Sequence, residues 1–232
     1  MPKVALYNVY RPQTFEDVCE QSSIITILKN QIETHTTSNV YLFVGPAGTG
    51  KTTTARILAK AVNNYTGSPI EMDAASNNGV DNIRDIIVRA SQQALDSEYK
   101  VFILDEVHAL SGAAWSAMLK LIEEPPRKTI FILCTTEVQK IPQTILSRVQ
   151  RFDFRRLSFN KIVERLQYIL QCEGITAYEK SAVDYIAKLS EGGMMSAISY
   201  LDTCLSLDKN LTLNSVLMAL GSVDYNVLFR LT

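Results

Sequence analysis

Short apolar runs alternate with helical periodicities along the first two thirds of the chain. The run Val40–Val44 is continuous, apolar and rich in β-branched and aromatic residues, which is typical of a strand buried on both faces of a parallel sheet. Further strands fit residues 70–73, 101–105, 130–135 and 151–154, and helices fit residues 22–33, 51–63, 82–95 and 113–123. This alternation predicts right-handed βαβ crossovers and a helix-covered parallel sheet.

The pattern changes after Leu157, where no further strand is predicted. Helices fit residues 160–173, 177–191 and 195–205, separated by Gly174 and the pair Gly192–Gly193, and a last apolar helix starts near Thr212. Residues 1–20 contain two prolines and are predicted to form an extended arm. We therefore expect an α/β domain over residues 1–158, a small all-helical domain over 159–208, and a separate segment over 209–232.

Composition and charge narrow the class of protein. Hydrophobic residues make up 47% and charged residues 20% of the 232 residues, which excludes a disordered or collagen-like chain. Lys and Arg total 23 against 24 Asp and Glu, for a net charge of -1, so a free-standing DNA binder with one broad basic face is not expected. The local exception is residues 148–156, which hold four Arg and one Asp and can form a phosphate-contacting or partner-contacting patch.

The sequence predicts a cytoplasmic protein that does not enter a membrane. Its apolar runs are too short to cross a bilayer, and its N-terminus meets charge and Pro too early for a signal peptide. The cysteines Cys19, Cys134, Cys172 and Cys204 are scattered, with no CxxC pair and no His nearby, so we expect neither a zinc site nor disulfides. They are interpreted as small buried apolar residues in a reducing cytosol.

The segment Gly45–Thr52 matches the phosphate-loop pattern GxxxxGK[ST] and lies between a predicted strand and a predicted helix. Its glycines allow backbone N–H groups to surround phosphates at a helix N-terminus. Lys51 can reach the β- and γ-phosphates, and the Thr52 hydroxyl can bind Mg²⁺. The residues expected to contact the nucleotide here are Gly45, Pro46, Ala47, Gly48, Thr49, Gly50, Lys51, Thr52 and Thr53.

Two carboxylates, Asp105 and Glu106, follow the strand predicted over residues 101–105. In open α/β sheets ligands bind beyond the carboxyl ends of the strands, which is also where the phosphate loop lies. Asp105 would hold Mg²⁺ through water, and Glu106 would orient and polarise the attacking water. By itself such a pair is more often a solvated loop or a helix cap, and it is the phosphate loop upstream that favours the catalytic interpretation.

Two further polar positions are weaker candidates. Thr135 and Thr136 end the next strand, where a hydroxyl can bond the attacking water or the γ-phosphate, but a plain strand-end turn fits equally well. Arg148 can be an arginine finger that stabilises transition-state charge, or simply an exposed charged helix end.

Taken together, these segments resemble the gamma/tau subunit family of the bacterial DNA polymerase III clamp loader, within the AAA+ ATPases. The resemblance covers nearly the whole chain. The segments that carry it are Tyr10-Arg-Pro-x-x-Phe15, Gly45–Thr52, Asp73-Ala-Ala-Ser-Asn-Asn-Gly-Val80, Asp105-Glu-Val-His108, Leu121-Ile-Glu-Glu-Pro-Pro126, Thr135-Thr136 and Ile145-Leu-Ser-Arg148.

The resemblance implies a P-loop AAA+ fold with a helical lid, and it places ATP and Mg²⁺ where the two domains meet. Asp105 and Glu106 become the Walker B pair, Thr136 the sensor 1 residue (with Thr135 as the alternative), and Arg148 a finger that reaches a neighbouring subunit's ATP. The residues implied near the adenine are Tyr10, Arg11, Pro12 and Val18.

The activity implied is that of an ATP-hydrolysing motor subunit that opens the sliding clamp and places it on primed DNA during replication. The implied partners are the delta and delta-prime subunits, further gamma/tau copies, the sliding clamp and primer-template DNA. Alternatives are an ATP-binding scaffold subunit with little hydrolysis, and another AAA+ DNA machine such as a branch-migration helicase. The segment Glu123–Pro126 argues against the helicase.

The sequence departs from the family in four places. Family members carry a four-Cys zinc module before the Asp73 segment, and here only residues 62–70 lie in that place, without Cys, so no zinc is expected. Val149 follows the candidate finger where the family has Cys. Met195 stands where the sensor 2 Arg is expected, and Met lacks the donors of a guanidinium. Residues 209–232 would be the start of a truncated or missing collar domain.

Overall fold

The computed structural model describes residues 4–92 and 97–221. The chain divides into two compact units. Residues 12–155 form the first, called here the sheet unit. The second, the helical unit, consists of the residues up to Arg11 together with those from Arg156 onward. The sequence-based expectation placed residues 1–158 together in one α/β domain. In the structure the residues up to Arg11 instead group with the helical unit.

The sheet unit contains five parallel strands in the order β2-β3-β4-β1-β5. They are β1 (Val40–Val44), β2 (Ile70–Asp73), β3 (Lys100–Asp105), β4 (Thr129–Thr135) and β5 (Gln150–Asp153). Strand β1 lies between β4 and β5, and its Leu42 pairs with Leu133 on β4 and with Arg151 on β5. Each crossover therefore returns the chain to the same end of the sheet, as the alternating pattern predicts.

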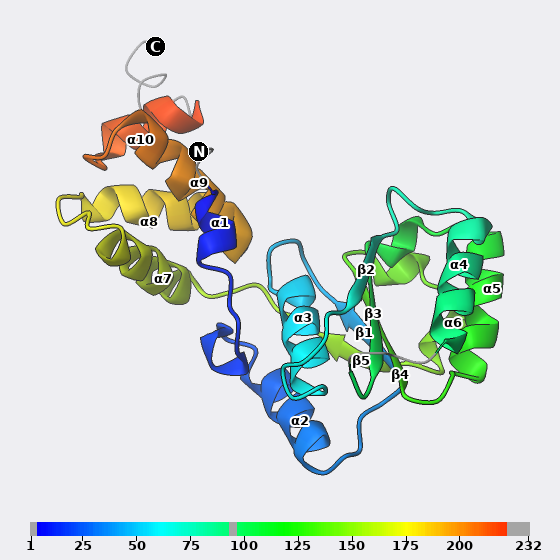
Figure 1. Ribbon diagram of the computed structural model, residues 1–232. Helices are drawn as coiled ribbons and strands as arrows, with labels where there is room; N and C mark the ends of the chain where they lie inside the picture. The colour runs from blue at the N-terminus through cyan, green and yellow to red at the C-terminus, as the bar shows by residue number, and fades with distance from the viewer. Residues whose placement is uncertain (1–3, 93–96, 222–232) are drawn as a thin grey trace. The chain divides into compact units, whose positions relative to one another are not determined.

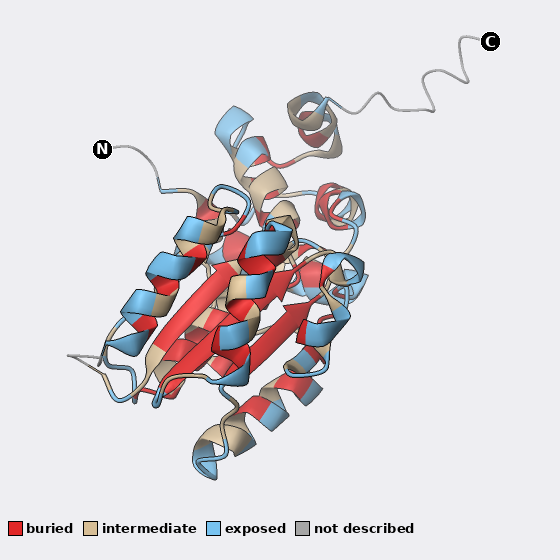
Figure 2. Cartoon of the chain, turned by 90° about the vertical axis from the view of Figure 1, so that its right-hand side faces the viewer, coloured by how far each residue is buried: buried red, intermediate tan, exposed pale blue. Residues whose placement is uncertain are grey.

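Helices cover both faces of this sheet (Figure 1). Alternate β1 side chains point to opposite faces, so Tyr41 and Phe43 enter one core and Leu42 and Val44 the other. The first core is shared with α2 (Ser22–Glu33) and α3 (Lys51–Ala61), the second with α4 (Val80–Ser91) and α5 (Gly112–Glu123). Figure 2 shows the strands buried behind helices whose outer faces are exposed. The short helix α6 spans Gln143–Leu146, and 3₁₀ turns span Phe15–Asp17 (η1), Val107–Ala109 (η2) and Val138–Lys140 (η3).

The helical unit has a core of aliphatic side chains from successive helices. Ile162, Leu166, Ile186 and Leu201 are all fully buried in it. Its helices are α1 (Leu6–Val9), α7 (Phe159–Cys172), α8 (Lys180–Leu189), α9 (Met194–Leu207) and α10 (Leu213–Leu220). After the sheet we expected helices and no strands, and this is confirmed for the described residues. An isolated bridge between Tyr178 and Leu211 pairs two residues there without forming a strand. The last part of the segment expected over residues 209–232 lies outside the described residues.

The extended arm expected over residues 1–20 is wrong for its described part, which contains α1 and η1. Leu6 is buried and its backbone N–H donates to Asp202 Oδ2 of α9 at 3.0 Å, so a distant partner stabilises the first helix. The Asp17 carboxylate accepts from both the backbone and the hydroxyl of Thr14 and caps η1.

Several helix boundaries also differ from expectation, and the starts of two helices differ most. The helix predicted over residues 177–191 begins at Lys180, because the Glu179 N–H donates to Leu211 O and its carboxylate accepts from the Leu213 N–H. The helix predicted over 82–95 begins at Val80 and ends at Ser91, and its expected last residues lie outside the described ones. Ser22 is the first residue of α2, and the side chain of the preceding Gln21 donates to Arg155 O.

The four cysteines are free. Cys134 and Cys204 are buried as expected, whereas Cys172 is exposed at the end of α7 and Cys19 is half-buried, so the expectation of burial is wrong for these two. Among the described residues no group of His, Cys, Asp and Glu has the arrangement of a metal site. None of the helices in the described part of the chain is long and apolar enough to span a bilayer.

Candidate nucleotide site

The carboxyl ends of β1, β3 and β4 bring the sequence-predicted site residues of the sheet to one edge. Val44 pairs with Thr135, and Asp105 ends β3 between β2 and β4. The phosphate loop therefore leaves β1 at the same edge as Asp105 and Glu106, at the end of β3, and Thr135 and Thr136, at the end of β4. This is the edge at which open α/β sheets bind ligands.

The phosphate loop uses backbone conformations that favour glycine. Gly45, Gly48 and Gly50 have φ angles of 152°, 73° and 99°. Gly50 is the N-cap of α3, so the loop leads directly into the positive end of an 11-residue helix. The loop also closes on itself, since the Thr49 hydroxyl donates to Pro46 O at 2.9 Å.

Gly45 tolerates no larger side chain. A Cβ there would lie 2.4 Å from the carbonyl oxygen of Phe154 and 2.9 Å from its Cβ. We expect Gly45→Ala to destabilise the sheet unit by about 1–3 kcal/mol, measured by chemical unfolding. Gly112→Ala is the matched control, because a Cβ at Gly112 meets nothing within 4 Å. Equal stability of the two variants would show that the approach of Phe154 does not constrain the loop.

Lys51 is buried, with 6% of its surface exposed. Its Nζ donates to Gly45 O at 2.8 Å and to Pro46 O at 2.9 Å, which holds the ammonium over the loop. Burial lowers the pKa of Lys51, and the neighbouring Cys134, Glu106 and Asp105 oppose that shift. A cation that has lost much of its hydration interacts strongly with an anion placed in the loop.

Thr52 and Asp105 form a direct contact across the sheet edge. The Thr52 hydroxyl donates to Asp105 Oδ2 at 2.6 Å. A hydroxyl oxygen beside a carboxylate is a donor set that suits Mg²⁺, a hard cation that prefers oxygen ligands. The residues present therefore fit the ion that the sequence predicts here, with Thr52 and Asp105 as its protein contacts.

Glu106 has a left-handed backbone conformation, with φ of 50°. Its N–H donates to Asp105 Oδ1 at 3.0 Å, and its Oε2 accepts from the Thr136 hydroxyl at 3.3 Å. Strained conformations of this kind persist where the surroundings hold them. The strain turns the chain at the end of β3, so consecutive carboxylates take up different positions at the sheet edge.

Thr135 and Thr136, which the sequence leaves as alternatives, have different surroundings. Thr135 is fully buried, and its hydroxyl contacts the His108 ring and accepts from the Glu137 N–H. Thr136 is half-buried and bonds Glu106 directly. The contact with Glu106 supports Thr136, rather than Thr135, as the sensor 1 residue. That role stays a prediction.

Sequence reasoning missed two residues of this site, His108 and Glu137. His108 is isolated from other His in the sequence, yet its Nδ1 lies 3.2 Å from Glu106 Oε2 and its Nε2 lies 3.2 Å from Glu137 Oε1. Lys140 donates to Glu137 Oε1 at 2.9 Å and lowers the pKa of that carboxyl. The usable signal was the position of His108, three residues after Asp105 in a one-turn 3₁₀ helix.

Arg148 lies outside this group of residues. It follows α6 and is partly exposed, with its Nη1 donating to Thr144 O and its Nη2 3.1 Å from Glu123 Oε1. Other arginines of the basic segment are paired too, Arg151 with Asp153 and Arg156 with Glu191. An exposed Arg148 agrees with a role at a subunit boundary, and that role stays a prediction.

The residues expected near the adenine belong to different units. Tyr10 and Arg11 are in the helical unit, where the Tyr10 hydroxyl donates to Glu173 Oε1 at 2.6 Å and Tyr10 O accepts from Arg165. Burial and the Glu173 carboxylate raise the pKa of Tyr10. Pro12 and Val18 are in the sheet unit. Their grouping around a nucleotide therefore stays a prediction.

The segment expected to carry sensor 2 begins α9. Met195 is the second residue of that helix and is 53% exposed. Before it, Gly192 has a φ of 83°, and a Cβ there would lie 2.7 Å from Arg156 Cβ. The Arg156 guanidinium bonds Glu191 O, so a cation does lie near the start of α9 although Met occupies position 195.

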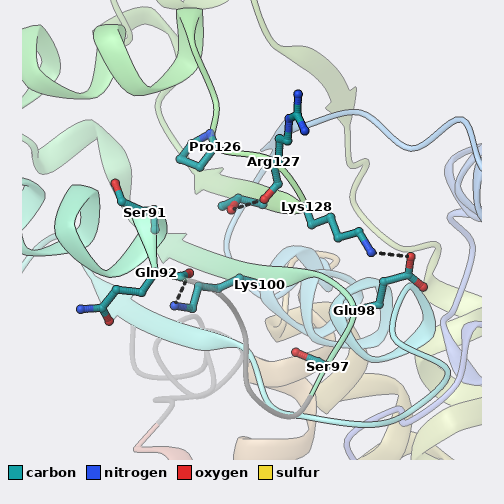
Figure 3. A pocket seen from close by; sticks show the side chains of 10 residues that line it. Ser91, Gln92, Ser97, Glu98, Lys100, Pro126, Arg127 and Lys128 are labelled. Atoms are coloured by element: carbon teal, nitrogen blue, oxygen red, sulfur yellow. Dashed lines mark hydrogen bonds and ion pairs between the residues drawn. The ribbon is translucent and has the colours of Figure 1, made fainter.

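The structure also has a pocket of about 540 Å³ at the opposite edge of the sheet (Figure 3). Lys100 and Thr129, the first residues of β3 and β4, help to line it. Its two lysines contact the chain's own groups, since Lys100 donates to Gln92 O and Lys128 lies 3.5 Å from Glu98. The pocket is therefore distinct from the edge that holds the phosphate loop.

Solved structures with the same architecture include the RuvB Holliday junction branch migration motor of Thermotoga maritima. The match has a TM-score of 0.74 at 18% identity and covers 91% of this chain and 72% of that one. A mutant form of RuvB matches with a TM-score of 0.75 at 18% identity, over 92% of this chain and 73% of that one. The five-stranded parallel sheet, the phosphate loop and the helical part together define a P-loop fold of the AAA+ class, as predicted.

Sequence relatives identify the family within that class. The chain is 44% identical to DNA polymerase III subunit tau of Bacillus subtilis, over 95% of this chain and 43% of the relative. It is 37% identical to DNA polymerase III subunit gamma of Buchnera aphidicola, over 98% of this chain and 67% of the relative. Residues 69–158 also match the family model described as DNA polymerase III, delta subunit. The chain belongs to the DNA polymerase III gamma/tau family, and it spans less than half the length of the tau subunits it matches.

Proposed function

We propose that this protein is an ATP-hydrolysing motor subunit of a DNA polymerase III clamp loader. The observation that carries the proposal is the convergence of Lys51, Thr52, Asp105 and Glu106 at one edge of the sheet. Each of these side chains has the chemistry that phosphoryl transfer to water requires: a cation for the phosphates, oxygen ligands for Mg²⁺ and a carboxylate for the attacking water.

The mechanism follows from the positions of these groups. Backbone N–H groups of the phosphate loop and Lys51 bind the phosphates and neutralise the charge that develops on them. Thr52 and Asp105 would hold Mg²⁺, which when bound would withdraw charge from the phosphate oxygens. Glu106 orients a water and accepts its proton, and the Thr136 hydroxyl, 3.3 Å from Glu106 Oε2, helps to orient the carboxylate.

The proposed partners follow from the relatives, which are named DNA polymerase III subunits. They are the delta and delta-prime subunits, further gamma/tau copies, the sliding clamp and primer-template DNA. The near-neutral charge of the chain suits a protein that contributes one part of a shared DNA-binding surface. We place its action in the cytoplasm, where bacterial DNA is replicated.

The test is steady-state ATP hydrolysis by the protein alone and in a reconstituted loader, with clamp and primed DNA added in turn. A motor subunit is expected to turn over ATP faster when all components are present. No stimulation in a loader shown by sedimentation to be complete would refute the proposal.

A second candidate function is an ATP-binding scaffold subunit with little turnover. Met195, which has no donors to offer a γ-phosphate, favours it. The intact Lys51, Asp105 and Glu106 oppose it. If the unsubstituted protein and Glu106→Gln bind ATP tightly and show the same negligible turnover, the scaffold is the better description.

Arg148 allows a test of action between subunits. We expect Arg148→Ala to leave ATP binding by the isolated protein unchanged and to lower hydrolysis in the assembled loader about 10³-fold. Arg151→Ala is the control, because Arg151 is similarly exposed and pairs with Asp153. Loss of ATP binding by isolated Arg148→Ala, measured by fluorescence titration, would contradict a role in a neighbouring site.

A further inference from the structure

We propose that His108 is a positioning residue for Glu106: the imidazole ties the carboxylate at the end of β3 to Glu137 beyond the end of β4. The inference rests on the proposed ATP hydrolysis and concerns how its attacking water is aligned. It assigns a function to a side chain outside the phosphate loop and the carboxylate pair.

The ring lies between two elements that are also joined by the pairing of β3 with β4 and by the bond of Thr136 to Glu106. Nδ1 lies 3.2 Å from Glu106 Oε2 and 3.1 Å from Thr135 Oγ1, and Nε2 lies 3.2 Å from Glu137 Oε1. The side chain of His108 is only 17% exposed, whereas those of Glu106 and Glu137 are 37% and 35% exposed. The ring is largely buried and therefore already immobile. It loses less side-chain entropy on contacting the two carboxylates than a mobile surface side chain would lose.

Both ends of this connection are anchored. On the β3 side, Val107 is fully buried and the Ala109 N–H donates to Glu106 O, which fixes the turn that carries the ring. On the β4 side, the Glu137 N–H donates to Thr135 Oγ1, and its carboxylate accepts from Lys140. The ring therefore transmits the position of the β4 end to Glu106.

Glu106 needs such support, because the bonds that fix its backbone leave its side chain free to rotate. It has φ of 50° at the first position after the strand, and its side chain is more than a third exposed. The Thr136 hydroxyl and His108 Nδ1 contact the same oxygen, Oε2, and together orient the carboxyl group. Displacement of a catalytic group by about 1 Å can cost on the order of 10²-fold in rate.

The test compares His108→Ala, His108→Asn and His108→Gln. An Asn side chain carries its amide nitrogen the same number of bonds from Cβ as Nδ1, whereas Gln carries it at the distance of Nε2. We expect His108→Ala to lower kcat about 10-fold with KM for ATP unchanged. Asn, which can contact Glu106, is expected to restore most of the loss, and Gln, which reaches toward Glu137, to restore little. A loss of ATP affinity equal to the drop in kcat, or equal rescue by Asn and Gln, would overturn the proposal.

A second measurement separates action through Glu106 from an independent effect. In single-turnover assays His108→Ala is expected to add no further loss in a Glu106→Gln background, because the group it positions is already gone. A further loss of about 10-fold in the double variant would overturn the positioning role.

The two proposals fail in different ways. An unaltered rate for His108→Ala, with Glu106→Gln inactive, overturns only the role of His108. An unaltered rate for Glu106→Gln overturns the proposed hydrolysis at this site, and the role of His108 with it.

Discussion

Glu106→Gln is expected to lower kcat for ATP hydrolysis by about 10²–10⁴-fold, the range for loss of a general base, while the Kd for ATP changes by less than about twofold. Gln has the shape of Glu and can still accept from the Thr136 hydroxyl, which lies 3.3 Å from Glu106 Oε2. It cannot take a proton from water. Single-turnover hydrolysis and equilibrium titration with ATP measure the two quantities separately.

The matched control is Glu33→Gln, at the exposed end of α2 and remote from the sheet edge. It also removes one carboxylate and leaves the fold unchanged, so its kcat is expected to equal that of the unsubstituted protein. If Glu106→Gln reduces ATP binding as strongly as turnover, Glu106 contributes to the ground state rather than to the chemical step.

Lys51→Met is expected to lower kcat/KM for ATP by about 10²-fold or more, because Met fills the space of the Lys side chain and lacks its charge. The loss should appear in both binding and turnover, since the ammonium contacts phosphates before and during the reaction. The fold should survive the change, as burial already disfavours the charged form of Lys51 and lowers its pKa. Thermal unfolding and ATP titration test these expectations.

Lys60→Met, in the last turn of the same helix, is the control for charge and for helix propensity. It is expected to bind ATP normally. If Lys51→Met binds ATP as tightly as Lys60→Met does, the loop does not hold the phosphates through this side chain. An unfolded Lys51→Met would instead show that the bonds to Gly45 O and Pro46 O stabilise the loop.

Local signals predicted the sheet unit well. The strands Val40–Val44 and Ile70–Asp73 and the helix Ser22–Glu33 have the bounds expected from their apolar patterns, because buried side chains repeat at the period of each element. The phosphate loop and the pair at Asp105 are contiguous in sequence, and their chemistry follows from residue type and from the strand before each.

Residues that depend on distant partners could not be predicted in this way. His108 and Glu137 meet because β3 and β4 are neighbours in the sheet, and nothing near either residue indicates that order. The local sequence predicts that Glu179 is helical. Its carboxylate instead accepts from the Leu213 N–H, and α8 starts at Lys180, later than expected. In each case tertiary contacts override the local preference.

The placement of α1 in the helical unit has a consequence for synthesis of the chain. The Leu6 N–H donates to Asp202, which lies 196 residues later, so the docking of α1 depends on a contact between distant parts of the chain. Domains usually fold in the order in which they leave the ribosome. Here α1 cannot dock on α9 until α9 has been translated, and the whole of the sheet unit is translated in between. Although it precedes the sheet unit in the chain, α1 therefore reaches its final place only after that unit has been made.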